Sequence, residues 1–374
     1  AMTRTAMFLG MALACGLVGA AAAAAEPIVG NPKLQSIESI SFAPDGVLLI
    51  GDGRGAQVVA VHTGDVKPGG AAKILIADLT KQIGARLGTD AKGVEIIKLA
   101  VNPASERVYL AVRKLSNKQD LILKVDGDKL EELPLENVKH QRFALPADDK
   151  APVVKITDVT FADGRILLAV QAKEQFASKI YSIDTRQDDA APYFISTETF
   201  HVAHARWETN APIRTVIPYK EGGKTYLVGA FTCTPIVKYS LDDVKSGGRV
   251  QGKSVIELGN GNTPQDMFVY EKAGKSYILM NNFRMAKFHE KNPVGPSPYW
   301  TAKVEHGILT ENEKVNEKAL WRVGAKANES KTDRVSVAQD FHGVMMMDRM
   351  GADRAAVIRA DNAGTLSLEV VPLP

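Results

Sequence analysis

Residues 37–50, IESISFAPDGVLLI, contain the pattern that decides the fold. Apolar and polar residues alternate through Ile37–Ala43, Asp45-Gly46 follows, and Val47–Ile50 begins a second apolar run. Alternation with a period of two predicts a half-buried strand, and an Asp-Gly pair between two such runs predicts a tight hairpin turn. This stretch therefore predicts two antiparallel strands.

The same strand–turn–strand unit returns along the rest of the chain. Its turns begin near residues 45, 103, 163, 222, 273 and 351, so the units are about 55 residues apart except for the last. Four short strands per unit at such a period are typical of the blades of a β-propeller. We expect an all-β propeller of six four-stranded blades. Seven blades is the alternative, because the gap between the last two turns is long enough for one more.

The last unit offers only three strands, the third of them near Leu366–Val371. Residues 27–36 are not needed by the first unit, whose fourth strand we place at Lys73–Ala77. We therefore expect the N-terminal segment 27–36 to complete the last blade and close the ring. Helix signals nearly vanish, and the best of them, Asp78–Ile83, covers one or two turns.

The N-terminal residues 1–25 have the pattern of a signal peptide. Arg4 is followed by the apolar run Met7–Ala20, and Ala23-Ala24-Ala25 offers a cleavage site before Glu26. We expect export to a bacterial periplasm or beyond, with residues 26–374 as one propeller domain. No later apolar stretch is long enough to predict a membrane span in the mature chain.

Composition excludes several classes of function. The chain has 374 residues, 45% of them hydrophobic and 24% charged, with a net charge of +3. A nucleic-acid binder normally has a marked basic excess, so no nucleic-acid partner is expected. The chain also lacks a P-loop, a nucleophile elbow, a zinc-protease helix motif and a haem attachment motif.

The repeated strand, Asp-Gly or Asn-Pro turn and second strand resemble secreted bacterial propellers of the broad NHL, YVTN and gluconolactonase-like group. The resemblance covers nearly the whole mature chain. In the gluconolactonase-type enzymes a carboxylate on an early strand and further Asn and Asp residues bind a divalent metal, and Glu38 and Asp266 are similarly placed. Glu38 is followed here by Ser39, Ile40 and Ser41, where those enzymes have glycine, proline and tryptophan.

Propeller topology sorts the loops onto two faces. One face carries the connections that lead into each first strand and those that join the second and third strands; we call it the near face. The opposite face, which we call the far face, carries the turns between the first and second strands. The less common residue types fall on the near face, so we expect function there. The candidate ligand-binding residues are Glu38, Arg54, Arg113, Asp158, Glu174, Asn282, Arg284 and His342.

Four further residues are candidates for a metal site near the central axis. His201 and His204 precede the first strand of the fourth unit, Cys233 follows its second strand, and Asp266 lies on the same face. Histidine and cysteine together suit copper or zinc. For Cys233 the favoured interpretation is a buried thiol with no metal; the alternative is a divalent ion, copper, zinc or calcium, held at these four residues.

Two functions remain open. The favoured one is an exported binding module that holds a small molecule, a metal ion or a protein partner on its channel face. The alternative is a metal-dependent hydrolase or lactonase-like enzyme, in which a divalent ion acidifies a water molecule beside a carboxylate base.

Overall fold

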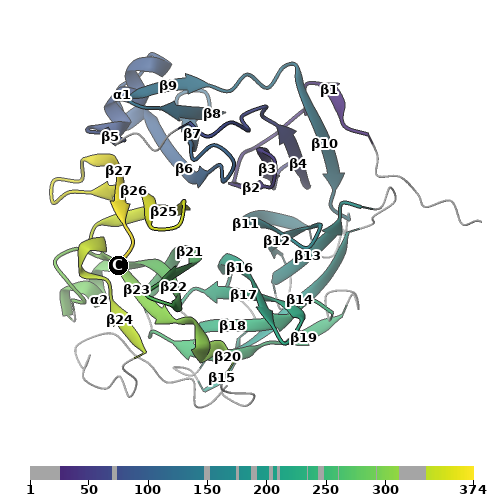
Figure 1. Cartoon of the computed structure of the whole chain (residues 1–374), viewed down its shortest axis with the longest axis vertical. Coiled ribbons are helices and arrows are strands. Elements are labelled where there is room, and N and C mark those ends of the chain that lie inside the picture. Colours follow the sequence, from purple (N-terminus) through teal and green to yellow (C-terminus); the bar gives the residue numbers. More distant parts are fainter. Residues whose placement is uncertain are drawn as a thin grey trace, which may run out of the picture.

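Six antiparallel sheets form a closed ring around a central channel in the computed structural model of the chain (Figure 1). The structure describes residues 26–69, 74–146, 152–173, 177–186, 192–201, 205–208, 211–233, 235–242, 248–259, 261–291, 293–310 and 334–374. Each sheet contains a four-stranded blade, and three short strands extend two of the sheets. The predicted six-bladed β-propeller is confirmed.

We number the blades by their innermost strands in chain order. Blade 1 contains β2 (Ser39–Ala43), β3 (Val47–Asp52), β4 (Gln57–His62) and β10 (Val138–Ala144), with β1 (Ile28–Gly30) outside β10. Blade 2 contains β6 (Val94–Val101), β7 (Val108–Lys114), β8 (Gln119–Asp126) and β9 (Lys129–Glu132). Blade 3 contains β11 (Val153–Ala162), β12 (Arg165–Ala172), β13 (Ser178–Asp184) and β14 (Tyr193–His201), joined by β15 (Arg206–Glu208) and β19 (Arg249–Gln251).

The second half of the chain forms the other three blades. Blade 4 contains β16 (Ile213–Glu221), β17 (Lys224–Phe231), β18 (Pro235–Ser240) and β20 (Lys253–Glu257). Blade 5 contains β21 (Asn262–Lys272), β22 (Lys275–Arg284), β23 (Tyr299–Glu305) and β24 (Val335–Val337). Blade 6 contains β25 (Val344–Met350), β26 (Arg354–Ala360), β27 (Leu366–Pro372) and β5 (Leu75–Ile76).

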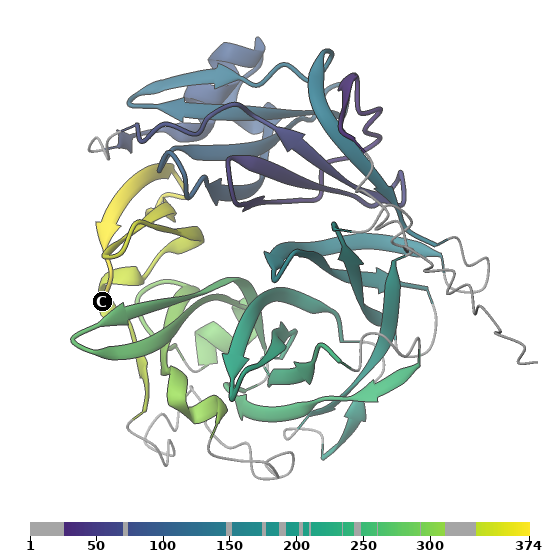
Figure 2. The same ribbon diagram turned by 45° about the vertical axis from the view of Figure 1, so that its right-hand side comes forward.

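The blades do not follow one another around the ring in sequence order. The innermost strands are neighbours in the order β2, β11, β16, β21, β25, β6 and back to β2, so blade 2 lies between blades 6 and 1 (Figures 1 and 2). After β4 the chain adds β5 to blade 6, builds blade 2, and then returns to add β10 to blade 1. Two blades are therefore each assembled from segments far apart in sequence.

The ring is closed by an N-terminal strand, but not by the segment that the sequence suggested. Ile76 pairs with Leu368 in blade 6, whereas residues 28–30 pair with β10 of blade 1. The expected fourth strand of the first unit, 73–77, thus contains the strand that closes the last blade. Before β10 and β5 are added, β4 and β27 each have an unpaired edge, and local sequence patterns do not distinguish one edge from the other. The sequence therefore led to the wrong blade for each of the two segments.

Six clusters of buried apolar side chains fill the spaces between the blades, among the residues that the structure describes. Each cluster combines residues of two neighbouring blades; Leu49 of blade 1 and Ile166 of blade 3 share one of them. A single four-stranded sheet is apolar on both faces here and cannot bury them alone, so stacking in a ring is what gives the chain a core.

Two helices accompany the strands. α1 (Leu79–Leu87) is longer than the sequence indicated, and its Leu79 and Ile83 pack into the cluster between blades 2 and 6. α2 (Ala286–Lys291) follows β22, and short 3₁₀ turns cover 91–93, 306–309 and 339–341. None of the described helices is both long and apolar enough to cross a membrane.

The expected hairpin turns are confirmed. Asp45 and Gly46 have φ values of 60° and 67°, and Asp163 and Gly164 have values of 50° and 72°. Two successive residues with positive φ are what a type I′ turn requires, and Asp and Gly tolerate that conformation best. These turns place the far-face ends of the inner strands at one mouth of the channel.

Candidate functional site

The innermost strands change direction where they line the channel. Strands β6, β11, β16, β21 and β25 each show a break in pairing register, at Ile96/Lys98, Ile156/Asp158, Ile213/Thr215, Pro264/Met267 and Val344/Met346. A bulge turns a side chain out of the regular alternation. Polar residues at these points, Lys98, Asp158, Thr215 and Asp266, line the channel although the strands around them are mainly apolar.

A buried ion-pair network crosses the channel at this level. The ammonium Nζ of Lys98 lies 2.6 Å from Asp266 Oδ1 and 3.4 Å from Asp158 Oδ1. The three side chains come from blades 2, 5 and 3 and are 15%, 8% and 8% exposed. Burial by itself would lower the pKa of Lys98, but the two carboxylates outweigh it and hold the pKa well above its usual value.

Carboxylates of this level also join neighbouring blades. Asp158 Oδ2 accepts a hydrogen bond from the backbone N–H of Val216 at 2.9 Å, and Asp266 Oδ2 accepts one from Met347 at 2.9 Å. Three more backbone N–H groups donate to a carboxylate of a neighbouring blade, each at 2.8 Å. Ile156 donates to Glu38, Val101 to Asp348 and Ile37 to Asp120. These carboxylates therefore hold neighbouring blades together, and some of them also line the channel.

A cavity of about 440 Å³ lies on the far-face side of the network. Lys98, Asp158, Asp266, Asp348 and Arg349 provide its charged part, and most of the other lining residues are apolar. Ser41 also lines the cavity, and its buried Oγ has no hydrogen-bond partner among the described residues. A concave, mainly apolar site with a few convergent polar groups is the usual form of a small-molecule site.

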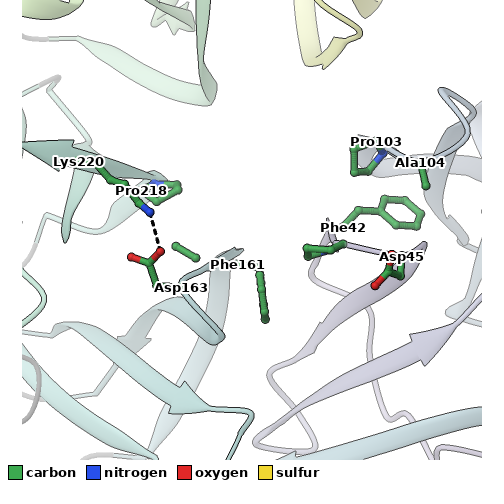
Figure 3. A pocket seen from close by; sticks show the side chains of 10 residues that line it. Phe42, Asp45, Pro103, Ala104, Phe161, Asp163, Pro218 and Lys220 are labelled. Carbon is green, nitrogen blue, oxygen red and sulfur yellow. Dashed lines mark ion pairs between the residues drawn. The ribbon is translucent and has the colours of Figure 1, made fainter. Parts of the chain in front are cut away.

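The cavity continues into a wider hollow of about 670 Å³ at the far-face mouth. Phe42, Pro103 and Pro218 line both spaces. Figure 3 shows Phe42 and Phe161 from neighbouring blades at this hollow, with the Lys220–Asp163 ion pair (2.7 Å) on its rim. The described concave site thus opens on the far face, whereas sequence reasoning placed function on the near face.

Several predicted ligand-binding residues lie on the near-face side of blades 1 and 2. Glu38 Oε2 accepts the backbone N–H of Ile156 and lies close to Gly53, where a Cβ would be 1.9 Å from it and would push the carboxylate aside. Burial raises the pKa of Glu38, an effect that the Ile156 amide partly offsets. Arg113 is already paired, with Nε 2.6 Å from Asp120 Oδ1, while Arg54 is exposed.

The remaining predicted ligand-binding residues fall into three places. Asp158 belongs to the channel network. Asn282 and Arg284 are buried on β22, where Arg284 Nη1 donates to Asn262 Oδ1 at 3.3 Å. His342 follows the 339–341 turn with Nε2 3.2 Å from Gln339 Oε1, and burial lowers its pKa. Glu174 lies outside the described residues.

The three predicted metal ligands that the structure describes, Asp266, His201 and Cys233, do not gather at one point. Asp266 lines the channel in its pair with Lys98, whereas His201 ends β14, the fourth strand of blade 3, with its ring 6.5 Å from that of Phe231. Cys233 is half-buried in the β17–β18 connection and donates its backbone N–H to Asn262 O at 2.9 Å. His204 lies outside the described residues, and among those described no group of three or more His, Cys, Asp or Glu could hold a metal.

Sequence reasoning missed Lys98, Arg214 and Asp348. Lys98 and Asp348 each interrupt an apolar run of a first strand, as in IIKLAV at 96–101 and MMMD at 345–348, and Arg214 follows Ile213 at the start of another. A charge in such a strand must be paired or functional, since burying it alone is costly. That signal is present in the sequence.

We expect Asp348 to make stability fall as the pH rises. Burial raises its pKa from 3.8 to about 6, so between these values the native state binds more protons than the unfolded state. The wild type should therefore lose stability relative to Asp348→Asn as the pH rises. Between about pH 4 and pH 7 the difference in unfolding free energy should shift by about 1–3 kcal/mol in favour of the variant, measured by urea unfolding. Asp184→Asn is the control, because Arg186 lowers the pKa of Asp184 to about 2; its difference from the wild type should stay constant above about pH 5.

No known protein-family profile matches the chain, and no curated protein matches it in sequence. Similar solved structures include a bifunctional GH43-CE protein of Bacteroides eggerthii (11% identity, 81% of this chain and 34% of that one, TM-score 0.38). A second is the mitotic checkpoint complex (9% identity, 99% of this chain and 100% of that one, TM-score 0.35). A third is the C-terminal WD40 domain of Sif2 (9% identity, 95% of this chain and 77% of that one, TM-score 0.32). The chain spans about a third of the first of these. Such low similarity says nothing about what the chain binds or catalyses.

Proposed function

We propose that this protein is an exported bacterial propeller of the NHL, YVTN and gluconolactonase-like group that binds a small molecule in its channel cavity. The observation that carries the binding role is the cavity of about 440 Å³ with the unpartnered Ser41 hydroxyl beside the Lys98 network. The signal-peptide pattern of residues 1–25 supports export.

The chemistry of the cavity favours a ligand with an apolar body and an amine. Phe42, Ile217 and Met267 supply apolar surface. Three carboxylates, those of Asp158, Asp266 and Asp348, line the cavity together with two cations, Lys98 and Arg349. An ammonium group would be attracted by this excess of negative charge and could donate a hydrogen bond to Ser41 Oγ.

Binding is a better proposal than metal-dependent hydrolysis. A metal-bound water needs carboxylate oxygens that are free to coordinate the ion. Asp158 and Asp266 already share Lys98, and each accepts a backbone N–H from the next blade. Freeing them would break contacts that join the blades, so these carboxylates suit ligand recognition more than metal coordination.

The test compares two probes with the same phenylethyl body and opposite charge, phenethylamine and 3-phenylpropionate, by calorimetric titration at fixed ionic strength. Phenethylamine should bind more tightly, and Ser41→Ala should weaken its binding about threefold to tenfold through the lost hydrogen bond. Tyr193→Ala, an exposed aromatic of blade 3, is the control and should leave binding unchanged. Equal binding of both probes, or no effect of Ser41→Ala, would contradict the proposal.

A further inference from the structure

Two cationic side chains lie at the end of the channel opposite the cavity. Lys155 precedes Asp158 on β11, and Arg214 occupies the bulge between Ile213 and Thr215 on β16. The two strands are neighbours in the ring, joined through the hydrogen bond from Val216 to Asp158. Neither cation lines the far-face cavity, so the Lys98 network separates them from it.

Neither of these cations forms an ion pair within the described part of the chain, although Asp158 and Asp266 act on Arg214 from further away, as Glu38 and Glu95 do on Lys155. Arg214 Nε is buried without a hydrogen-bond partner, and no described acidic group forms an ion pair with Arg214 or Lys155. The contrast with other cations of the channel is clear: Lys98 has two carboxylates, and Arg113 has Asp120 and Glu95. Lys155 is exposed, whereas Arg214 is partly buried. A partly buried, unpaired positive charge such as that of Arg214 is unfavourable unless something else supplies the counter-charge.

The nearest carboxylates are already engaged elsewhere. Asp158 accepts from Lys98, Ser39 and Val216, and Glu38 accepts the backbone N–H of Ile156. Burial lowers the pKa of both Lys155 and Arg214, and the charge of Arg214 lowers that of Lys155 further. The two cations therefore repel each other in a partly desolvated channel, an arrangement that an anion between them would relieve.

We propose that Lys155 and Arg214 form a binding site for a small oxyanion, a phosphate or carboxylate group, at the near-face end of the channel. The guanidinium offers Nε and an Nη in the planar fork that matches two anionic oxygens, and Lys155 adds a mobile point charge. This site goes beyond the proposed amine-binding function, because it lies on the other side of the Lys98 network and selects the opposite charge.

Titration calorimetry with inorganic phosphate, at ionic strength held constant with sodium chloride, tests the site. Wild-type protein should bind phosphate saturably, and Lys155→Gln and Arg214→Gln should each weaken binding about tenfold or more. Lys253→Gln removes an exposed charge on the outer strand β20 and should have no effect. A parallel titration with succinate shows whether a phosphate or a carboxylate group is preferred.

Thermal unfolding gives a second readout that a structural role would not reproduce. In a chloride buffer free of phosphate and carboxylate, Arg214→Gln should unfold at the same temperature as the wild type or higher, because it removes an unpaired charge. Phosphate should then raise the unfolding temperature of the wild type but not of Arg214→Gln.

Absence of saturable binding of either anion, equal binding by the variants, or strong destabilisation by Arg214→Gln without anion would overturn the proposal. Ser41→Ala serves to separate the two sites: it should alter phenethylamine binding and leave phosphate binding intact. A negative result for phosphate binding therefore leaves the proposed amine-binding function intact, and a negative result for phenethylamine leaves the proposed anion site intact.

Discussion

Lys98→Met is expected to destabilise the protein by about 3–5 kcal/mol, as measured by urea unfolding at neutral pH. The variant leaves the carboxylates of Asp158 and Asp266, each 8% exposed, without the ammonium that now lies between them. Removing one partner of a buried ion pair leaves an uncompensated buried charge, which costs far more than the pair itself contributes.

The chain offers a matched control for that variant. Lys220 forms an ion pair with Asp163 at a similar distance, 2.7 Å, but the two side chains are 70% and 40% exposed. Lys220→Met should therefore cost less than about 1 kcal/mol. Combining Lys98→Met with Asp158→Asn and Asp266→Asn should recover part of the lost stability. Similar small losses for Lys98→Met and Lys220→Met would show that the channel network is solvated.

The second large effect is expected at the strand that closes the ring. Ile76 is 1% exposed and belongs to the apolar cluster between blades 2 and 6, together with Leu79 and Leu368. Ile76→Ala removes buried methyl and methylene groups and leaves a cavity at a two-residue strand, so it should cost about 2–5 kcal/mol of unfolding free energy.

Leu75 is the control within the same strand, because its side chain points the other way and is 68% exposed. Leu75→Ala should change stability by less than about 0.5 kcal/mol. If the two alanine variants proved equally stable, the pairing of β5 with β27 would not be what closes the ring.

Much of the fold was predictable because a blade is a local object. The alternation in 37–43 and the Asp-Gly turns at 45 and 163 decide their hairpins within about ten residues of chain, and no distant contact is needed. The number of blades followed from the spacing of these turns. The helix α1 was underestimated, because its apolar face becomes visible only against blades 2 and 6.

The candidate site was less predictable. Asp158 and Asp266 were singled out, but for different purposes, and the residue that joins them, Lys98, was not. Its pairing with carboxylates 60 and 168 residues further along depends on which blades lie opposite one another across the channel. That arrangement is not encoded in any local pattern.

Local sequence patterns account for the blade, its strands and its turns, since period-two alternation and turn chemistry act between residues close along the chain. Which blades are neighbours depends instead on contacts between distant parts of the chain. After three strands, both blade 1 and blade 6 present an unpaired edge to any passing strand, and backbone hydrogen bonds at such an edge do not depend on side-chain identity. The choice of β10 for one edge and β5 for the other rests on burial, with Ile76 fitting the cluster between blades 2 and 6. That choice places blade 2 beside blade 6, and so brings Lys98 to the carboxylates of the channel.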